Sequence, residues 1–212
     1  MRAKKVAVLA PAPSPRREAA ARRLIEATLD CIATLGLRET TVPDIAARAG
    51  MAVGSISQYF AGKEALYTAA LDAMAREFAE RVAERVAAAG SSPARRLCAY
   101  VDAYFDVRTG QRRKVAVWFA FWAEVQAQPQ YQAVCAGHDR AHDALVESLV
   151  SDLVGPAQSA AQARLLTSCC YGLWLELLTA HPRPSREALH ALAYQQLAAL
   201  FPAHATEFVP GT

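Results

Sequence analysis

Glycine and proline divide this chain into segments whose apolar residues recur at helical spacing. Strong helix formers, above all Ala and Leu, fill the segments, and runs of Val, Ile or Thr are few. In the first long segment Ala20, Leu24 and Ala27 begin an apolar series at mixed three- and four-residue spacing, and Gly36 then stands where a glycine cap ends a helix. The chain is therefore predicted to be all-α.

The same signals divide the whole sequence into helices and joints. Joints are expected at the turn 51–53, at Ala61-Gly62, at the stretch 90–93 and at Gly155-Pro156. Helices are predicted over 16–35, 41–50, 54–60, 63–88, 93–107, 110–127, 129–154, 157–180 and 185–201.

The segment 41–60 has the pattern of two short helices that cross closely at a three-residue turn. Thr41 stands as N-cap with Asp44 three residues later, the spacing of a capping box. Small residues at 46 and 50 permit close approach of the two helices. The outward residues of the second helix are small or polar, as suits a helix end that enters the major groove of DNA: Val53, Gly54, Ser55, Ser57 and Gln58.

Residues of this segment have side chains suited to binding DNA. Gln58 can pair with two edges of a base, preferably adenine, and Ser55 and Ser57 can donate to a phosphate or a base edge. Phosphate contacts are also expected from Thr41, Tyr59 and Lys63. Residues 1–63 carry ten Lys and Arg against five Asp and Glu, on a chain of net charge +3, which favours a polyanionic partner for this end.

The residues of 41–66 resemble the DNA-binding domain of the TetR family. The matching pattern is Thr-Val-x-x-Ile-Ala-x-x-Ala-Gly-x-x-x-Gly-x-Ile-x-x-Tyr-Phe-x-x-Lys-Glu-x-Leu. The resemblance implies a homodimer with a three-helix DNA-binding head, a linking fourth helix, a ligand-binding body and a four-helix dimer interface. Ser57 replaces the Tyr of many members, so one phosphate contact is expected to be absent. The run 56–60 is similar to the choline-responsive BetI subgroup.

Two aromatic clusters in the second half of the chain are candidates for a ligand site. Trp118, Phe121 and Trp122 share one helical face, and Tyr171 and Trp174 follow two helices later. A carboxylate lies near each cluster, Glu124 near the first and Glu176 near the second. Aromatic faces beside an anion can bind a quaternary ammonium, and these segments also look like the BetI C-terminal domain, which implies choline or a related cation. The alternative is an ordinary aromatic core.

An apolar stripe predicts a subunit interface: Leu165, Leu166, Cys169, Leu173 and Leu177. A dimer would present its recognition helices about 34–36 Å apart, which predicts a pseudo-palindromic double-stranded operator. The partners expected are therefore operator DNA, a small-molecule effector and a second copy of the chain. The longest interior apolar run, 115–123, is too short to cross a bilayer, so no membrane contact and a cytoplasmic location are expected.

Two other classes of function are compatible with parts of the sequence. His138 and His142 lie four apart beside Asp139 and Asp143, a spacing that can bind metal or support acid–base chemistry, so a metal-dependent helical enzyme is one alternative. A purely architectural DNA-binding protein is the other. Motifs for a nucleophile, a phosphate loop or a dinucleotide are absent from the sequence, and we expect no catalytic residues, cofactor or bound metal.

Four parts are expected along the chain. They are a disordered basic arm over 1–15, a helix-turn-helix DNA-binding domain over 16–62, a helical ligand-binding and dimerisation domain over 63–202 and a loose tail over 203–212. The five scattered cysteines are expected to be free thiols.

Overall fold

The structure, a computed structural model, describes residues 14–210, and within that range the regular elements are all helical. The α-helices are α1 (Pro15–Leu35), α2 (Val42–Ala49), α3 (Lys63–Ala88), α4 (Pro93–Tyr104), α5 (Arg112–Glu124), α6 (Pro129–Val154), α7 (Pro156–Thr179) and α8 (Arg186–Leu200). Short 3-10 helices add η1 (Val53–Gln58), η2 (Val125–Ala127) and η3 (Pro202–Glu207). The all-α prediction is confirmed. The predicted arm falls mostly on residues 1–13, which lie outside the described residues.

Side-chain caps fix the ends of the first two helices. Ser14 caps the first turn of α1, one residue earlier than expected. At α2 the predicted capping box is present: the amide of Asp44 donates to the Thr41 hydroxyl, and the amide of Thr41 donates to the Asp44 carboxylate at 2.9 Å. Gly50 ends α2 in the left-handed conformation, with φ of 63°.

The second element of the helix-turn-helix differs from its prediction. It is a 3-10 helix that ends at Gln58, rather than an α-helix over 54–60. Two hydroxyls bond back to its own turn: Ser55 Oγ donates to the carbonyl of Ala52 at 2.7 Å, and Ser57 Oγ to that of Gly54 at 3.0 Å. Such local bonds compete with α-helical geometry, and Gly54 adds no propensity for an α-helix.

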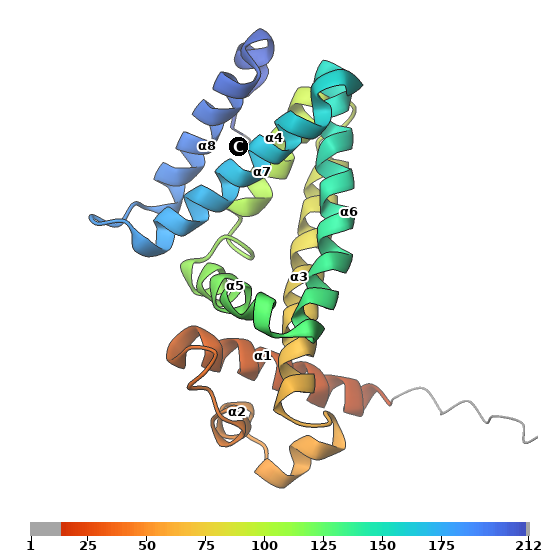
Figure 1. Ribbon diagram of the computed structural model, residues 1–212, viewed down its shortest axis with the longest axis vertical. Helices are drawn as coiled ribbons and strands as arrows, with labels where there is room; N and C mark the ends of the chain where they lie inside the picture. Colours follow the sequence, from red (N-terminus) through yellow and green to blue (C-terminus); the bar gives the residue numbers. More distant parts are fainter. Residues whose placement is uncertain (1–13, 211–212) are drawn as a thin grey trace, which may run out of the picture.

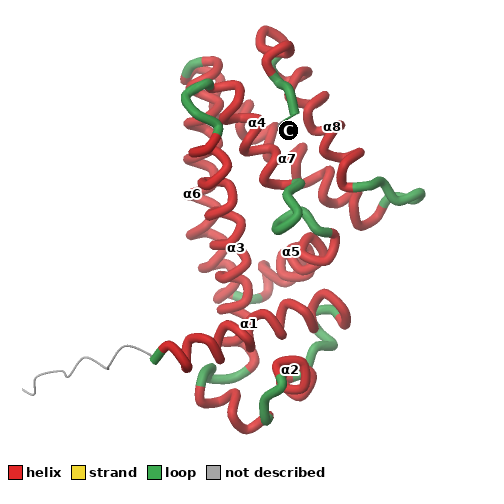
Figure 2. The backbone as a smooth tube through the Cα atoms, turned by 180° about the vertical axis from the view of Figure 1, so that it is seen from behind, coloured by secondary structure: helices red, strands yellow, loops and turns green. Residues whose placement is uncertain are grey.

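The helices form a small head and a larger body joined by α3 (Figure 1). The head contains α1, α2 and η1 with the first turns of α3. From there α3 runs the length of the body beside α6, and α4, α7 and α8 complete the distal end, as the view from behind also shows (Figure 2). Helix α5 lies across the middle, between α1 of the head and α7 of the body.

A single hydrophobic core runs through head and body. Leu24 and Ile45 in the head belong to the same packed cluster as Leu66 on α3 and Trp174 on α7. Tyr67 connects the parts directly. Its hydroxyl donates to the carbonyls of Leu37, at 3.3 Å, and Thr40, at 3.0 Å, and its ring meets Phe121 of α5 edge-on. Burial raises the pKa of Tyr67 to about 12.

The loop between α4 and α5 is longer than predicted because α4 ends at Tyr104. Asp106 turns its buried carboxylate toward Arg81 and Arg85 on α3, and these guanidinium groups together with the amide of Arg108 hold the pKa of Asp106 far below its usual range despite burial. Gly110 is required here because a Cβ at this position would lie 2.2 Å from the carbonyl oxygen of Tyr104.

From residue 203, where a loose tail is expected, the chain folds back onto the core as far as Phe208. The chain turns through η3, and Phe208 packs edge-on against Phe201 and is buried. An aromatic side chain eight residues past the end of α8 can return to the core, which the proline after that helix did not indicate.

Candidate functional site

The recognition turn, η1 with Tyr59, presents most of the predicted DNA-binding side chains at the surface of the head. Ile56 points inward and is buried, which anchors the turn. Val53, Gly54, Ser57 and Gln58 are exposed. Ser55 and Tyr59 are half-buried, as is Lys63, which stands at the start of α3 with its ammonium 5.1 Å from the centroid of the Tyr67 ring.

The serine and threonine hydroxyl groups near this turn already have hydrogen-bond partners. Ser55 and Ser57 donate to backbone carbonyls of their own turn, and Thr41 Oγ1 donates to Asp44 at 2.5 Å. Each must rotate before it can donate to a phosphate. The exposed amide of Gln58 needs no such exchange, which makes it the strongest candidate for reading a base.

Two arginines of α1 that the sequence-based prediction did not include reach the helix-turn-helix. Arg17 Nη2 donates to the carbonyl of Gln58 at 2.8 Å, and its guanidinium lies 5.9 Å from the centroid of the Tyr59 ring. Arg23 Nη2 donates to the carbonyl of Ala49 at 2.5 Å. The contacts span 41 and 26 residues of sequence, so only their positive charge was visible beforehand.

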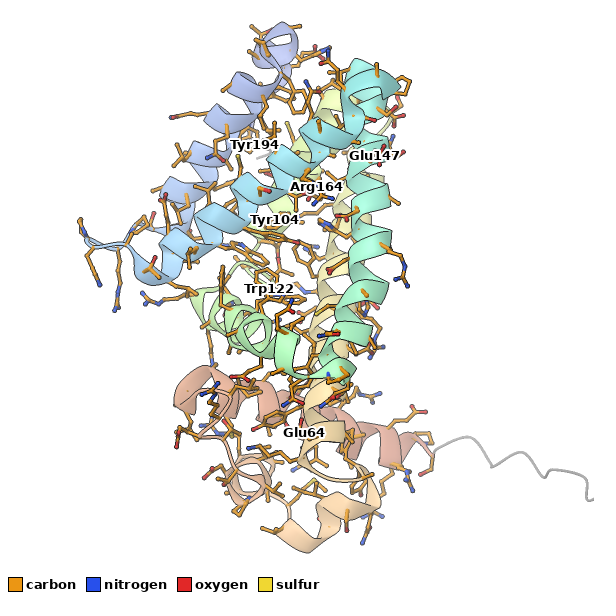
Figure 3. The ribbon with its side chains drawn as sticks, viewed as in Figure 1. Glu64, Tyr104, Trp122, Glu147, Arg164 and Tyr194 are labelled. Atoms are coloured by element: carbon orange, nitrogen blue, oxygen red, sulfur yellow. The ribbon has the colours of Figure 1, made fainter. Side chains whose placement is uncertain are left out.

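The body contains an aromatic cavity of about 170 Å³ between α3, α5, α6 and α7. Five rings line it in a closed circuit, which we call the aromatic cage. The centroid distances are 5.6 Å for Trp118–Trp122, 5.0 Å for Trp122–Tyr171, 6.4 Å for Tyr171–Trp174, 5.7 Å for Trp174–Phe78 and 6.5 Å for Phe78–Trp118. Figure 3 shows Trp122 of α5 in the space between α5 and α7. Four of these rings were predicted, and Phe78 was missed.

Three other residues predicted for the ligand site lie elsewhere. Phe121 is fully buried on another side of α5, where its ring meets Tyr67 and Tyr131. Glu124 pairs with Arg38 of the head at 2.7 Å, and Glu176 is exposed on α7. Phe121 is adjacent to a cage ring in the sequence, and Glu124 and Glu176 are each two residues from one, but helix neighbours at these spacings point in different directions.

The carboxylate that borders the cage is Asp139 of α6. Burial and, second, the negative charge of Asp143 raise its pKa, while His142 and His138 act in the opposite sense. A cation placed in the cage would relieve this crowding of negative charge. Asp139 also borders a wider groove of about 340 Å³ between α6 and α7, whose walls include Glu147 and Arg164 (Figure 3).

The two histidines of α6 have separate partners rather than a shared ligand. His138 Nε2 lies 3.0 Å from Asp72 of α3. His142 Nε2 lies 3.0 Å from both the Tyr100 and the Tyr104 hydroxyl, and burial lowers the pKa of its imidazole. Across residues 14–210 no group of three or more His, Cys, Asp or Glu is placed to hold a metal ion.

The apolar stripe predicted on α7 is divided between two environments. Leu166, Leu173 and Leu177 are buried within the chain, so they are not available to a partner. Leu165 and Leu175 are 53% and 45% exposed and form the apolar part of the outer face. In the described range, the helices lack a stretch both long and apolar enough to cross a bilayer. All five cysteines are free.

Family models match most of the chain. The model described as the C-terminal part of BetI-type transcriptional repressors matches residues 93–202, and the one described as bacterial regulatory proteins of the tetR family matches residues 24–70. The second match extends past residue 62 into α3, in agreement with the packing of the first turns of that helix into the head.

Individual proteins show the same similarity. The HTH-type transcriptional regulator BetI 1 of Chromohalobacter salexigens is 35% identical over 47% of this chain and 49% of its own length. BetI of Stenotrophomonas maltophilia is 38% identical over 45% and 49%. The chain spans about half the length of the curated relatives it matches.

Solved structures share the fold. A transcriptional regulator from Rhodococcus sp. superposes with a TM-score of 0.77 at 22% identity, covering 86% of this chain and 96% of its own. A regulator from Saccharomonospora viridis, solved in complex with choline, gives 0.75 at 19% identity with the same coverage.

Proposed function

Because the chain belongs to the TetR family of bacterial regulatory proteins, and within it to the BetI type, we propose that it is a transcriptional repressor that binds operator DNA as a homodimer and is released by a small cation. The observation that carries the proposal is the combination of two features. An exposed recognition turn contains Gln58, and an aromatic cage with Asp139 at its edge lies in the body.

For the DNA-binding half, the support is the exposure and chemistry of the recognition turn. The proposed contacts are Gln58 to a base and Tyr59, Lys63 and the hydroxyls of Thr41, Ser55 and Ser57 to the backbone, with Val53 and Gly54 close to the groove. Leu165 and Leu175 belong to the proposed dimer face. Two copies would then read a pseudo-palindromic site.

For the effector, the support is the chemistry of the cage. Indole and phenol faces attract a quaternary ammonium by about 0.5–2 kcal/mol per desolvated contact. Asp139 supplies the counter-charge, and a buried, neutral His142 adds no opposing charge near neutral pH. The effector class proposed is a small quaternary ammonium such as choline, the ligand of the Saccharomonospora viridis regulator.

Helix α5 provides a route from the cage to the head. It carries Trp118 and Trp122, and each of its ends is bound to the head: Arg113 pairs with Asp30 at 2.7 Å, and Glu124 with Arg38. We propose that α5 acts together with α3 as the lever between effector and DNA. An effector changes DNA affinity only if it prefers one of the two arrangements of the lever.

The test combines DNA and effector binding. Fluorescence anisotropy is measured at low and moderate salt with duplexes tiled across the promoter region of the protein's own gene. It should identify one preferred duplex, and choline should then weaken the binding of the protein to that duplex. Calorimetry should measure choline binding to the free protein. Indifference to every duplex at low salt would overturn the DNA-binding half of the proposal. A failure of every small quaternary ammonium to bind would overturn the effector half alone.

A further inference from the structure

The first turn of α1 places Arg17 against the recognition turn. One N–H of its guanidinium donates to the Gln58 carbonyl at 2.8 Å, and its carbon lies 5.9 Å from the centroid of the Tyr59 ring. Gln58 and Tyr59 are the last residue of the 3-10 helix and the residue that caps it. Arg17 therefore contacts the end of the turn at two consecutive residues.

The recognition turn needs an external support because its own structure is weak. It has six residues in 3-10 geometry and no side-chain hydrogen bond at its N-cap, and two of its hydroxyl groups are used on its own backbone. The carbonyl at the C-terminal end of a short helix has no partner within the helix, and a cation is favoured there. Arg17 supplies both the donor and the charge.

The first element of the helix-turn-helix is supported in the same way. Arg23 of α1 donates to the carbonyl of Ala49, the last residue of α2, and stands 3.4 Å from the position of a Cβ on Gly50. Helix α1 thus contributes one guanidinium to the C-terminal end of each short element. Because the same kind of contact occurs at both short elements, we interpret it as a support that α1 provides, and not as a chance contact of one exposed side chain.

We propose that Arg17 is a positioning residue for operator recognition, which holds Gln58 in the orientation that reads a base and Tyr59 in the orientation that meets the DNA backbone. The inference rests on the proposed DNA-binding function. A planar guanidinium can donate to the backbone carbonyl of Gln58 while it lies beside the Tyr59 ring, and its other N–H groups remain free for a phosphate. A lysine ammonium is a point charge that cannot make the first two contacts together.

The experiment compares Arg17→Met, Arg17→Lys and the control Arg22→Met, whose wild-type residue pairs with exposed Glu18 at 4.0 Å on the same helix. Affinity is measured for the preferred duplex and for a scrambled duplex. We expect both Arg17 variants to lower the ratio of specific to non-specific affinity by roughly threefold to tenfold, and the control to leave it unchanged. Arg17→Lys should retain non-specific affinity because it retains the charge.

Two results would overturn the inference. One is an equal loss of affinity for both duplexes in Arg17→Met, with wild-type affinity in Arg17→Lys, since Arg17 would then be a plain phosphate contact. The other is an unchanged ratio in both Arg17 variants.

Hydrogen exchange in the free protein gives a readout that does not depend on DNA. Amides of 53–60 should exchange faster in Arg17→Met than in Arg22→Met, while those of the body stay unchanged. If the wild-type protein preferred no duplex, the proposed function would fail, and exchange alone would decide whether Arg17 holds the turn. Equal exchange in the two variants would show that it does not.

Discussion

The recognition turn of the head and the aromatic cage of the body differ in how their residues are gathered along the chain. The turn takes its exposed side chains from one stretch, 53–59, and depends on caps and on arginines from α1. The cage takes its five rings from three helices, and its carboxylate from a fourth. One site is local and exposed on the surface of the head, whereas the other is dispersed and lines a partly open cavity.

This difference decides how substitutions act on each site. An exposed side chain in the turn can change without disturbing the core, so its loss should alter DNA binding and leave stability alone. The cage rings are also core residues, so a change there acts on packing as well as on ligand binding. Head and body should therefore respond to mutation in different measurements.

The largest effect is expected from Gly110→Ala in the loop between α4 and α5. The added Cβ would lie 2.2 Å from a backbone oxygen, so the loop or the end of α4 must shift. We expect a loss of about 3 kcal/mol in unfolding free energy by chemical denaturation. The matched control is Gly137→Ala on α6, where no atom lies within 4 Å and Ala should stabilise by up to about 1 kcal/mol. Equal stability of the two variants would contradict the close contact.

Gln58→Ala tests the head side of the comparison. It should weaken binding to the preferred duplex by about 1–3 kcal/mol and flatten discrimination at one base position. Its melting temperature and its affinity for choline should equal those of the wild type, because Gln58 is exposed and far along the chain from the cage. A change in melting temperature as large as the change in DNA affinity would break the proposed separation.

Trp122→Leu tests the body side. Loss of one cage face should weaken choline binding by about 1 kcal/mol in calorimetry, with unchanged DNA affinity in the absence of ligand. Phe119→Leu is the control, because Phe119 lies on the same helix with its ring 5.1 Å from Trp122 but does not line the cavity. Similar losses in both variants would indicate a packing effect instead of a lost cation contact.

Acidification should weaken choline binding through two titratable groups at the cage, Asp139 and His142. The raised pKa of Asp139 lies above the ordinary 3.8, and the lowered pKa of His142 lies below the ordinary 6.5. Protonation removes the negative charge of Asp139 and adds a positive charge to His142, so both changes disfavour a bound cation. Affinity should be constant above pH 7 and fall between about pH 6.5 and 4. Asp139→Asn should reduce that fall, and a pH-independent affinity would remove both groups from the site.

The smallest effect concerns the link between the two regions. The pair Arg38–Glu124 joins head to α5, but Arg38 is largely exposed, so a double-mutant cycle with Arg38→Met and Glu124→Gln should give only about 0.5 kcal/mol of coupling in unfolding free energy. The more informative readout is the factor by which choline weakens operator binding. If that factor is the same in Glu124→Gln and wild type, α5 does not transmit through this pair.

Patterns along the sequence indicated more of the local site than of the dispersed one. The capping box at Thr41 and Asp44 and the buried position of Ile56 follow from spacing within a few residues. Helical spacing also indicated which face of α5 carries Trp118 and Trp122. It placed Phe121 on that face as well, although the i and i+3 positions diverge enough for Phe121 to pack toward α3.

Contacts between distant segments had no signal in the sequence. Phe78 and Asp139 reach the cage only because α3 and α6 pack side by side, and Glu124 meets Arg38 across 86 residues. The carboxylates nearest to the rings in the sequence therefore do not border the cage in the structure. The 3-10 geometry of the recognition turn was also missed, because hydroxyl-to-backbone bonds of Ser55 and Ser57 depend on rotamers that spacing does not specify.

The shared core has a practical consequence for building chimeric regulators. Leu66 and Tyr67 of α3 are buried with the head, and Tyr67 binds the carbonyls that precede α2. A splice at residue 62 would separate the head from the helix that completes it. A transplanted head should therefore carry α3 at least to Leu71, and a receiving scaffold must accept α5 against α1. Otherwise effector binding to the body would not change DNA binding by the head.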